Sequence, residues 1–294
     1  MLKRFFAPAL LLATILGPGG HAEAGNPVWF YRVESPAGKV TFFYPSFHLR
    51  DSRVKRPPMS MLDQVGRLVL EADVVKAKAH PERLTPYIIG PRPRDLGALF
   101  TSAEIKRIHA RADCNGVGPY TDSLRLAFIS AIVSMPCPKR DGNSYEEFVE
   151  QAAIKRGLDI VGLESGEEEL AALNSLPDRL YIADIKEWAT QPERLDQTIA
   201  EMIVLYNAGD LDALYEEMLR TETVSPADRD LFVRKLLLER NRHMVERLGD
   251  VLRDGHAVVI IGALHFPRAG GILDLLKHEG YRIARIDGSD GALR

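Results

Sequence analysis

An uninterrupted run of six apolar and small residues near the C-terminus, Ala257-Val-Val-Ile-Ile-Gly262, restricts this chain to a few architectures. The run is too short to cross a membrane and is rich in β-branched side chains, so it predicts a strand buried on both faces, as in a parallel sheet. Residues 270–278 then have helical spacing, and residues 281–286 alternate like another strand. This strand, helix, strand order indicates an α/β fold, and His265 follows the first strand at the edge where such sheets bind ligands.

Further strands are expected in the first half of the chain. Residues 28–44 contain two strand-like segments around Ser35-Pro-Ala-Gly38, a composition that favours a hairpin. Residues 61–75 run from a helix into a second apolar segment. Residues 158–163 form one more short apolar strand, which follows a helix terminus with basic residues and a glycine.

Most of the remaining sequence has helical spacing. Helical segments dominate residues 101–218, and one long helix is expected over residues 225–251, where Ser225-Pro226 provides a cap and a first-turn proline. We therefore predict an α/β fold with a mixed, largely parallel central sheet, flanking helices and a helical insertion over about residues 101–218.

The first residues have the features of a secretory signal peptide. Lys3-Arg4 is a basic region, residues 5–16 form an apolar core, and Ala22-Glu-Ala24 is a small-residue cleavage site. The apolar core is shorter than the roughly 20 residues that a membrane span needs. We expect cleavage to remove residues 1–24 and leave a domain over residues 25–294, without a membrane span and located in the periplasm or secreted.

The charge pattern argues against nucleic acid as a partner. The formal net charge is −3, and no basic stripe or alternation of basic and aromatic residues is present. The two cysteines, Cys114 and Cys137, are expected to form a disulfide in an oxidising compartment, closing a loop of 22 residues from 115 to 136. A nucleophilic or metal-binding cysteine is the weaker alternative, because neither residue has a histidine or second cysteine at ligand spacing.

Four titratable side chains follow predicted strands and would converge if these strands are neighbours: His48, Glu71, Glu164 and His265. Two imidazoles and a carboxylate suit a divalent metal ion such as Mn, Co, Zn or Fe. Such an ion activates water near neutral pH, and Glu164 is a candidate for the base that takes the proton.

Each of these residues also has a structural interpretation. His48 could lie in an exposed loop, and His265 could be a buried histidine satisfied by hydrogen bonds. Strand alternation could direct the Glu71 side chain toward solvent. If it is instead buried among its apolar neighbours, the carboxylate needs a partner. Glu164 could be merely the first acid of a helix N-terminus.

Arg240 lies within the predicted long helix, in the triplet Glu239-Arg-Asn241. A solvated or salt-bridged helix face is the usual explanation of such a triplet. Alternatively, Arg240 reaches the sheet edge and stabilises negative charge on a reacting oxygen. The remaining histidines are expected at the surface: His80, His109, His243, His256 and His278.

Several motifs in one order resemble the TraB/PrgY/GumN family over essentially the whole mature chain. The C-terminal motifs are Tyr206-Asn-Ala-Gly-Asp210-Leu211, Glu239-Arg-Asn241, Ile261-Gly-Ala-Leu-His265-Phe-Pro267, Gly271-Ile-Leu and Gly280-Tyr281. The N-terminal motifs are Val28-Trp-Phe, Leu70-Glu71-Ala-Asp73 and Gly162-Leu-Glu164. The family's relatives include the membrane-tethered, metal-dependent Tiki proteases, and its fold is similar to that of erythromycin-esterase and ChaN-like proteins.

The resemblance implies a site built from two Gly-x-x-His motifs and a glutamate. By position these residues are His48, Glu71, and Gly262 with His265, while Arg240 and Asn241 also match the family pattern. This chain departs from the first motif, because Pro45-Ser-Phe-His48 has proline in place of glycine. Proline fixes φ and lacks an amide donor, so either the loop is rebuilt around the same ligand or activity has decayed.

The leading hypothesis is an exported metal-dependent hydrolase, a peptidase-like enzyme that cleaves a peptide or protein substrate. The alternative is a non-catalytic envelope protein of this family that binds a peptide, a polysaccharide intermediate or a haem-like ligand in the same cleft. A third hypothesis is a structural accessory to envelope biosynthesis. The sequence does not specify the natural substrate, the metal or the oligomeric state.

Overall fold

The computed structural model describes residues 28–49, 51–135, 137, 145–220, 224–289 and 291–293. The predicted signal peptide, residues 1–24, lies outside this part of the chain. Six strands form one sheet in the order β4-β3-β5-β2-β1-β6. Their bounds are β1 Trp29–Glu34, β2 Val40–Ser46, β3 Arg67–Ala72, β4 Asp159–Glu164, β5 Ala257–Gly262 and β6 Arg282–Asp287.

The predicted mixed, largely parallel sheet is confirmed. β4, β3, β5 and β2 pair side by side in parallel, whereas β1 is antiparallel to both β2 and β6. The hairpin between β1 and β2 is present, and its turn ends at Gly38 with a positive φ of 78°. β6 does not lie beside β5, because the hairpin occupies the intervening positions in the sheet. The last helix therefore crosses over two strands.

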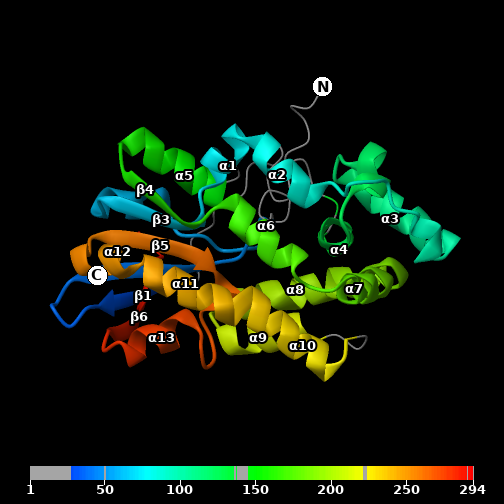
Figure 1. Cartoon of the computed structure of the whole chain (residues 1–294). Helices are drawn as coiled ribbons and strands as arrows, with labels where there is room; N and C mark the ends of the chain where they lie inside the picture. The colour runs from blue at the N-terminus through cyan, green and yellow to red at the C-terminus, as the bar shows by residue number, and fades with distance from the viewer. Residues whose placement is uncertain are drawn as a thin grey trace.

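Helices cover the sheet and extend beyond it (Figure 1). α5 packs on β3 and β4, while α11, α12 and α13 contact β4, β2 and β6 respectively. α3, α4 and α7 lie at the opposite end of the molecule from the sheet (Figure 1). The helices in the first two thirds of the chain are α1 Val74–Ala79, α2 Pro81–Ile88, α3 Ser102–Cys114, α4 Leu126–Val133, α5 Tyr145–Arg156, α6 Gly166–Asn174, α7 Asp178–Thr190, α8 Pro192–Ala208 and α9 Leu211–Leu219.

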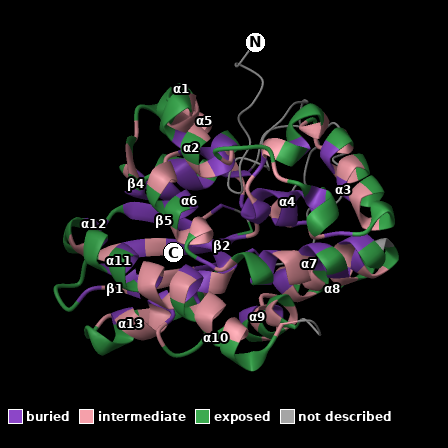
Figure 2. Ribbon diagram, turned by 45° about the vertical axis from the view of Figure 1, so that its right-hand side comes forward, coloured by how far each residue is buried: buried purple, intermediate pink, exposed green. Residues whose placement is uncertain are grey.

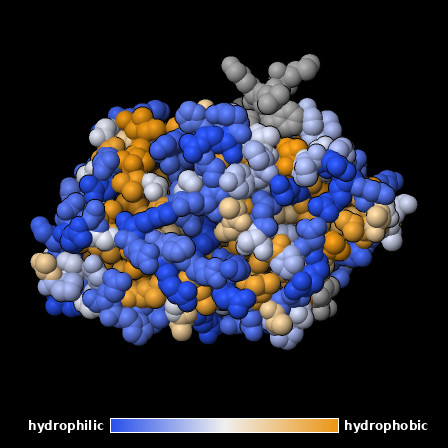
Figure 3. Space-filling model, viewed as in Figure 1, coloured by the Kyte–Doolittle hydropathy of each residue, from blue (hydrophilic) through white to orange (hydrophobic). Residues whose placement is uncertain are grey.

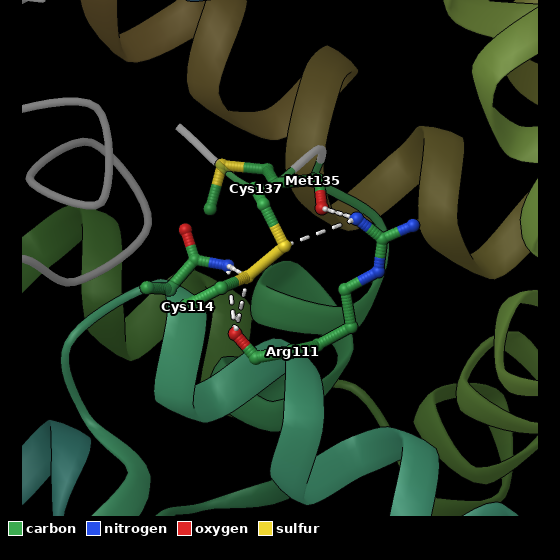
Figure 4. Close-up of a disulfide and its surroundings, with 5 residues drawn as sticks. Arg111, Cys114, Met135 and Cys137 are labelled. Atoms are coloured by element: carbon green, nitrogen blue, oxygen red, sulfur yellow. Dashed lines mark hydrogen bonds between the residues drawn. A yellow bond between two sulfur atoms is a disulfide. The ribbon is translucent and has the colours of Figure 1, made fainter. Parts of the chain in front are cut away.

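Two groups of buried apolar side chains stabilise these two regions. One surrounds the sheet, where every residue of β5 is buried (Figure 2). The other joins α3, α4 and α7 around Ile108, Phe128 and Ile185. The predicted disulfide is present in this second region, where it links Cys114 at the end of α3 to Cys137 beyond α4 (Figure 4).

The long helix predicted over residues 225–251 is largely confirmed, since the chain is helical without interruption from Pro226 to Arg247. The structure has α10 Pro226–Phe232, a π-helical segment over Val233–Leu238, α11 Glu239–Arg247, α12 Gly249–Asp254, and later α13 Ile272–His278. A π-turn widens the backbone by one residue and changes which side chains face the protein. This change of phase precedes Arg240 directly.

The helix and the strand predicted within residues 61–75 also have different bounds in the structure. A short 3₁₀ helix, Met59–Gln64, comes first, and β3 follows after Val65 and Gly66. Gly66 lies against the His256 ring, where a Cβ atom would approach within 3.1 Å.

Within the described residues, no helix is both long and apolar enough to cross a membrane. Apolar side chains do gather on the surface over α5 and β4 (Figure 3). Phe148 and Ile154 of α5 are exposed there.

Candidate functional site

The carboxyl ends of four neighbouring parallel strands bring the predicted site residues together. Glu71 and Glu164 lie at the ends of β3 and β4, where Ala72 pairs with Glu164. His48 follows β2 and His265 follows β5, and these strands end level because Ser46 pairs with Gly262. The predicted convergence of the four side chains is therefore observed in the structure.

Glu71 is at the centre of this group and is 5% exposed. Its Oε2 accepts a hydrogen bond from the Gly262 amide over 2.9 Å and lies 3.9 Å from His48 Nε2. Its Oε1 is 2.5 Å from Arg240 Nη2 and 3.5 Å from His265 Nε2. Burial alone raises the pKa of Glu71, but the charges of His265 and Arg240 outweigh it and hold the pKa well below its usual range. The alternative that Glu71 faces solvent is wrong.

Both histidines are oriented by an acceptor at Nδ1. His48 Nδ1 donates to Glu146 Oε1 over 2.9 Å, since an ionised carboxylate can only accept. The Asn241 amide donates through Nδ2 to the Gly270 carbonyl, so its Oδ1 is the atom that accepts from His265 Nδ1, at 2.5 Å. When each ring is neutral, its proton is on Nδ1 and Nε2 can bind a metal ion; both Nε2 atoms face Glu71.

Gly262 keeps a small space open between these side chains. Its φ of −53° and ψ of 136° are accessible to any residue, so the backbone does not require glycine. A Cβ atom here would lie 2.9 Å from His48 Nε2 and 3.2 Å from Glu71 Oε2. Glycine is needed for space at the point where three predicted site residues meet.

Arg240 connects the two strand-end glutamates. Its Nε donates to Glu164 at 3.1 and 3.0 Å, and its Nη2 contacts both Glu164 and Glu71. The Arg240 side chain is 11% exposed, so the alternative of a solvated helix face is wrong. Glu164 does not cap the next helix, because the N-cap of α6 is Ser165.

Two acidic residues near this group were missed by the sequence reasoning, Glu146 of α5 and Glu169 of α6, which are 6% and 5% exposed. Burial raises the pKa of Glu146, but the charge and hydrogen bond of His48 lower it to about 2. Burial lowers the pKa of His48, and Glu146 and Glu71 overcome this and raise it to about 9. Solvent still reaches the ring, whose side chain is 35% exposed. The sequence contains no signal for this burial, because both residues lie in acidic runs that are typical of a solvated helix face.

Pro45 does not prevent His48 from reaching the site. Pro45 lies inside β2, in register with Ile261 of β5, and its carbonyl accepts a hydrogen bond from the Tyr206 hydroxyl over 2.9 Å. The chain is extended here, a conformation that proline adopts readily. With Pro45 in the strand, His48 Nε2 still lies 3.9 Å from Glu71 Oε2.

The motif that begins at Tyr206 joins structural elements away from Glu71. Gly209 has a φ of 69° and ends α8, and a Cβ atom there would clash with Trp29 and Arg285. The Arg285 guanidinium stacks on the Trp29 ring at 3.9 Å. These contacts hold α8 against β1 and β6. The predicted surface histidines are exposed or half-buried: His80, His109, His243, His256 and His278.

In the part of the chain that the structure describes, no three His, Cys, Asp or Glu side chains form a group that could hold a metal ion as they stand. Arg240 Nη2 lies 2.5 Å from Glu71 Oε1.

Residues 29–285 match the model of the TraB/PrgY/gumN family. A search of curated proteins found no match, and neither did a search of solved structures.

Proposed function

The chain belongs to the TraB/PrgY/gumN family, and we propose that it is an exported metal-dependent hydrolase that cleaves peptide bonds. One observation carries the proposal: two histidines, far apart in the sequence, direct Nε2 at a single buried carboxylate while an acceptor holds each Nδ1. Metal-binding histidines in proteins usually have such an acceptor on the second ring nitrogen.

The proposed ligands are residue types that bind divalent ions. His48, His265 and Glu71 would hold it, and the nitrogen and oxygen donors suit Zn, Mn, Co or Fe. The space that Gly262 keeps free borders His48 and Glu71 and would be filled by a single methyl group. When bound, such an ion supplies charge stabilisation for a carbonyl oxygen and activates water near neutral pH.

The other residues of the site would position Arg240 and stabilise charge on the substrate. Glu164 and Glu71 hold Arg240 between them, which places its positive charge beside the proposed ligands. Arg240 would stabilise negative charge that develops on the substrate carbonyl oxygen. Both oxygens of Glu164 contact the guanidinium, so Glu164 suits a positioning role better than the base role that the sequence suggested.

Export is proposed from the composition of residues 1–24 and is supported by the disulfide, since disulfides persist in oxidising compartments. A second candidate function, a protein that binds a ligand in this site without a metal, is favoured by the Arg240 contact that already neutralises Glu71. Such a protein would bind an anionic group through Arg240 and would have no hydrolase activity.

The two functions are separated by metal content and cleavage. The purified protein without residues 1–24 would be analysed for bound metal by elemental mass spectrometry, and a peptide library would be screened for cleavage with and without a chelator. His48→Ala and His265→Ala would be compared with His278→Ala, a matched control whose ring is 77% exposed.

We expect about one divalent ion per chain in the unaltered protein and in the His278 variant, and little in the other two. Cleavage should be lost with the metal. Absence of metal from the unaltered protein, or metal that persists in both the His48 and His265 variants, would refute the proposed function.

A further inference from the structure

We propose that Tyr206 and Asn207, in the last turn of α8, are positioning residues for His48, a role that rests on the proposed hydrolase function. His48 is the proposed ligand that the sheet constrains least. Glu71 belongs to β3 and His265 to the turn directly after β5, and both are buried. His48 lies two residues beyond the end of β2, and its side chain is 35% exposed. Contacts from outside the sheet are therefore needed to hold it beside Glu71.

The segment that contains His48 is held by Asn207. Residues 47–49 and 51–58 belong to no helix or strand. Backbone groups outside regular structure need side chains or water as partners. Asn207 Nδ2 donates to the Arg53 carbonyl over 2.8 Å, and its Oδ1 accepts from the Lys55 amide over 3.0 Å. One side chain thus fixes this backbone at two points.

Tyr206 holds the start of the same segment. Its hydroxyl donates to the Pro45 carbonyl over 2.9 Å, and its ring stacks on Phe47 with the ring centroids 5.1 Å apart. The Tyr44 hydroxyl lies 2.5 Å from that of Tyr206 and 3.2 Å from the Lys55 carbonyl, so it connects the two ends of the segment. The residue after Phe47 is the proposed ligand, and a shift of this ring would move the imidazole.

The end of α8 is itself fixed to the sheet and can therefore act as a rigid support. Gly209 ends the helix, and Arg285 of β6 donates to the Ala208 carbonyl over 3.2 Å. The Arg285 guanidinium also stacks on Trp29 of β1. The contacts thus run from β1 and β6 through the end of α8 to the segment of His48. Functional groups are held accurately when such a rigid element supports them.

Two variants remove these contacts separately. Tyr206→Phe removes the hydroxyl but keeps the ring, and Asn207→Ala removes both hydrogen bonds to the backbone. Tyr181→Phe and Asn174→Ala are matched controls, because each of these side chains donates to a backbone carbonyl among α2, α6 and α7. Urea unfolding of all four variants would show how much each loses in overall stability.

The first measurement is limited digestion with trypsin in the presence of a chelator, so that the result does not depend on a bound ion. Trypsin cleaves after Lys and Arg but not before proline, so Arg53 and Lys55 are informative sites, whereas Arg56 precedes Pro57. Loss of the hydrogen bonds should favour local opening and raise cleavage at these two sites by about 5–30-fold. The controls should be cleaved there as slowly as the unaltered protein.

The second measurement is metal affinity by titration with Zn²⁺. We expect it to fall by about 10–100-fold in Tyr206→Phe and Asn207→Ala, as for other residues that orient a ligand. It should stay the same in the two controls, even where they lose as much stability in urea. This difference separates positioning of His48 from a general effect on the fold.

Three results would overturn the proposal. Unchanged cleavage after Arg53 and Lys55 in both variants would show that Tyr206 and Asn207 do not hold the segment. Faster cleavage with unchanged metal affinity would show that they serve the fold alone. Absence of metal from the unaltered protein refutes the proposed function before any variant is measured, and the positioning role fails with it.

Discussion

Asn241 Oδ1 accepts a hydrogen bond from His265 Nδ1 over 2.5 Å, and the same amide donates to the Gly270 carbonyl. The side chain is 1% exposed and connects α11 to the loop that follows β5. The two bonds allow only one orientation of the amide and therefore of the imidazole. Asn241 thus determines which nitrogen of His265 faces Glu71.

Replacing this residue, Asn241→Ala, should lower both stability and metal affinity. The change leaves His265 Nδ1 and the Gly270 carbonyl without partners in a buried site, which costs about 1–3 kcal/mol in the free energy of unfolding. Loss of such an orienting acceptor typically weakens metal binding by about 10–100-fold. Urea unfolding and metal titration measure the two effects. Gln197→Ala, at an exposed position of α8, is the control. Equal metal affinity in the two variants would contradict the prediction.

Gly262→Ala tests the space between the proposed ligands. The backbone angles at this position suit alanine, but the added methyl group would lie 2.9 Å from His48 Nε2. We expect at least about a tenfold loss of metal affinity, because a displacement of about 1 Å in a functional group is costly in such sites. Metal titration is the measurement. Gly249→Ala is a matched control, since no atom lies within 4 Å of the added group there, and its metal affinity should not change.

Much of this site could be predicted from the sequence, because ligands bind beyond the carboxyl ends of parallel strands. His48, Glu71, Glu164 and His265 each follow or end an apolar strand, and parallel neighbours bring such ends together. The order of the strands in the sheet could not be predicted, because long-range packing rather than the local sequence pattern determines which strands pair. The placement of β6 beyond the hairpin is one example.

Residues that reach the site from helices were harder to predict. Arg240 follows a π-helical segment, and helical periodicity contains no signal for such a turn. Glu146 and Glu169 have the composition of a solvated helix face, and only the tertiary packing of α5 and α6 buries them. Helix propensity therefore located these elements correctly while leaving their functional faces undetermined.

Removal of the disulfide by Cys114→Ser with Cys137→Ser should destabilise the helical region without affecting the site. A disulfide that closes a loop of this length lowers the entropy of the unfolded chain and stabilises the folded protein by about 3 kcal/mol. The free energy of unfolding in urea should therefore fall by a similar amount without it. The bridge joins the end of α3 to Cys137 beyond α4 (Figure 4). α3 and α4 lie at the opposite end of the molecule from β3 and β5 (Figure 1). Metal content should stay the same, and the mass change on alkylation with and without reductant reports the native bond.

Asp184 in α7 is half-buried and lies beside Ser130 and Trp188. Burial raises the pKa of Asp184 to about 6 from an ordinary value of 3.8, and the hydrogen bonds from Ser130 Oγ and Trp188 Nε1 oppose that increase. The folded protein therefore holds this proton more tightly than the unfolded chain does. It follows that the contribution of Asp184 to the free energy of unfolding should fall as the pH rises from about 4 to about 6 and level off above that.

Asp184→Asn should remove this part of the pH dependence, because the amide does not titrate. The difference in free energy of unfolding between the two proteins should change by up to about 3 kcal/mol between about pH 4 and about pH 7. Urea unfolding across this range measures it. In a Trp29→Phe background, Trp188 is the remaining tryptophan, and its indole donates to Asp184 over 2.8 Å. The Trp188 emission should therefore titrate near pH 6 when Asp184 is present and stay constant in the Asp184→Asn variant. The same transition in both proteins would assign the effect to another group.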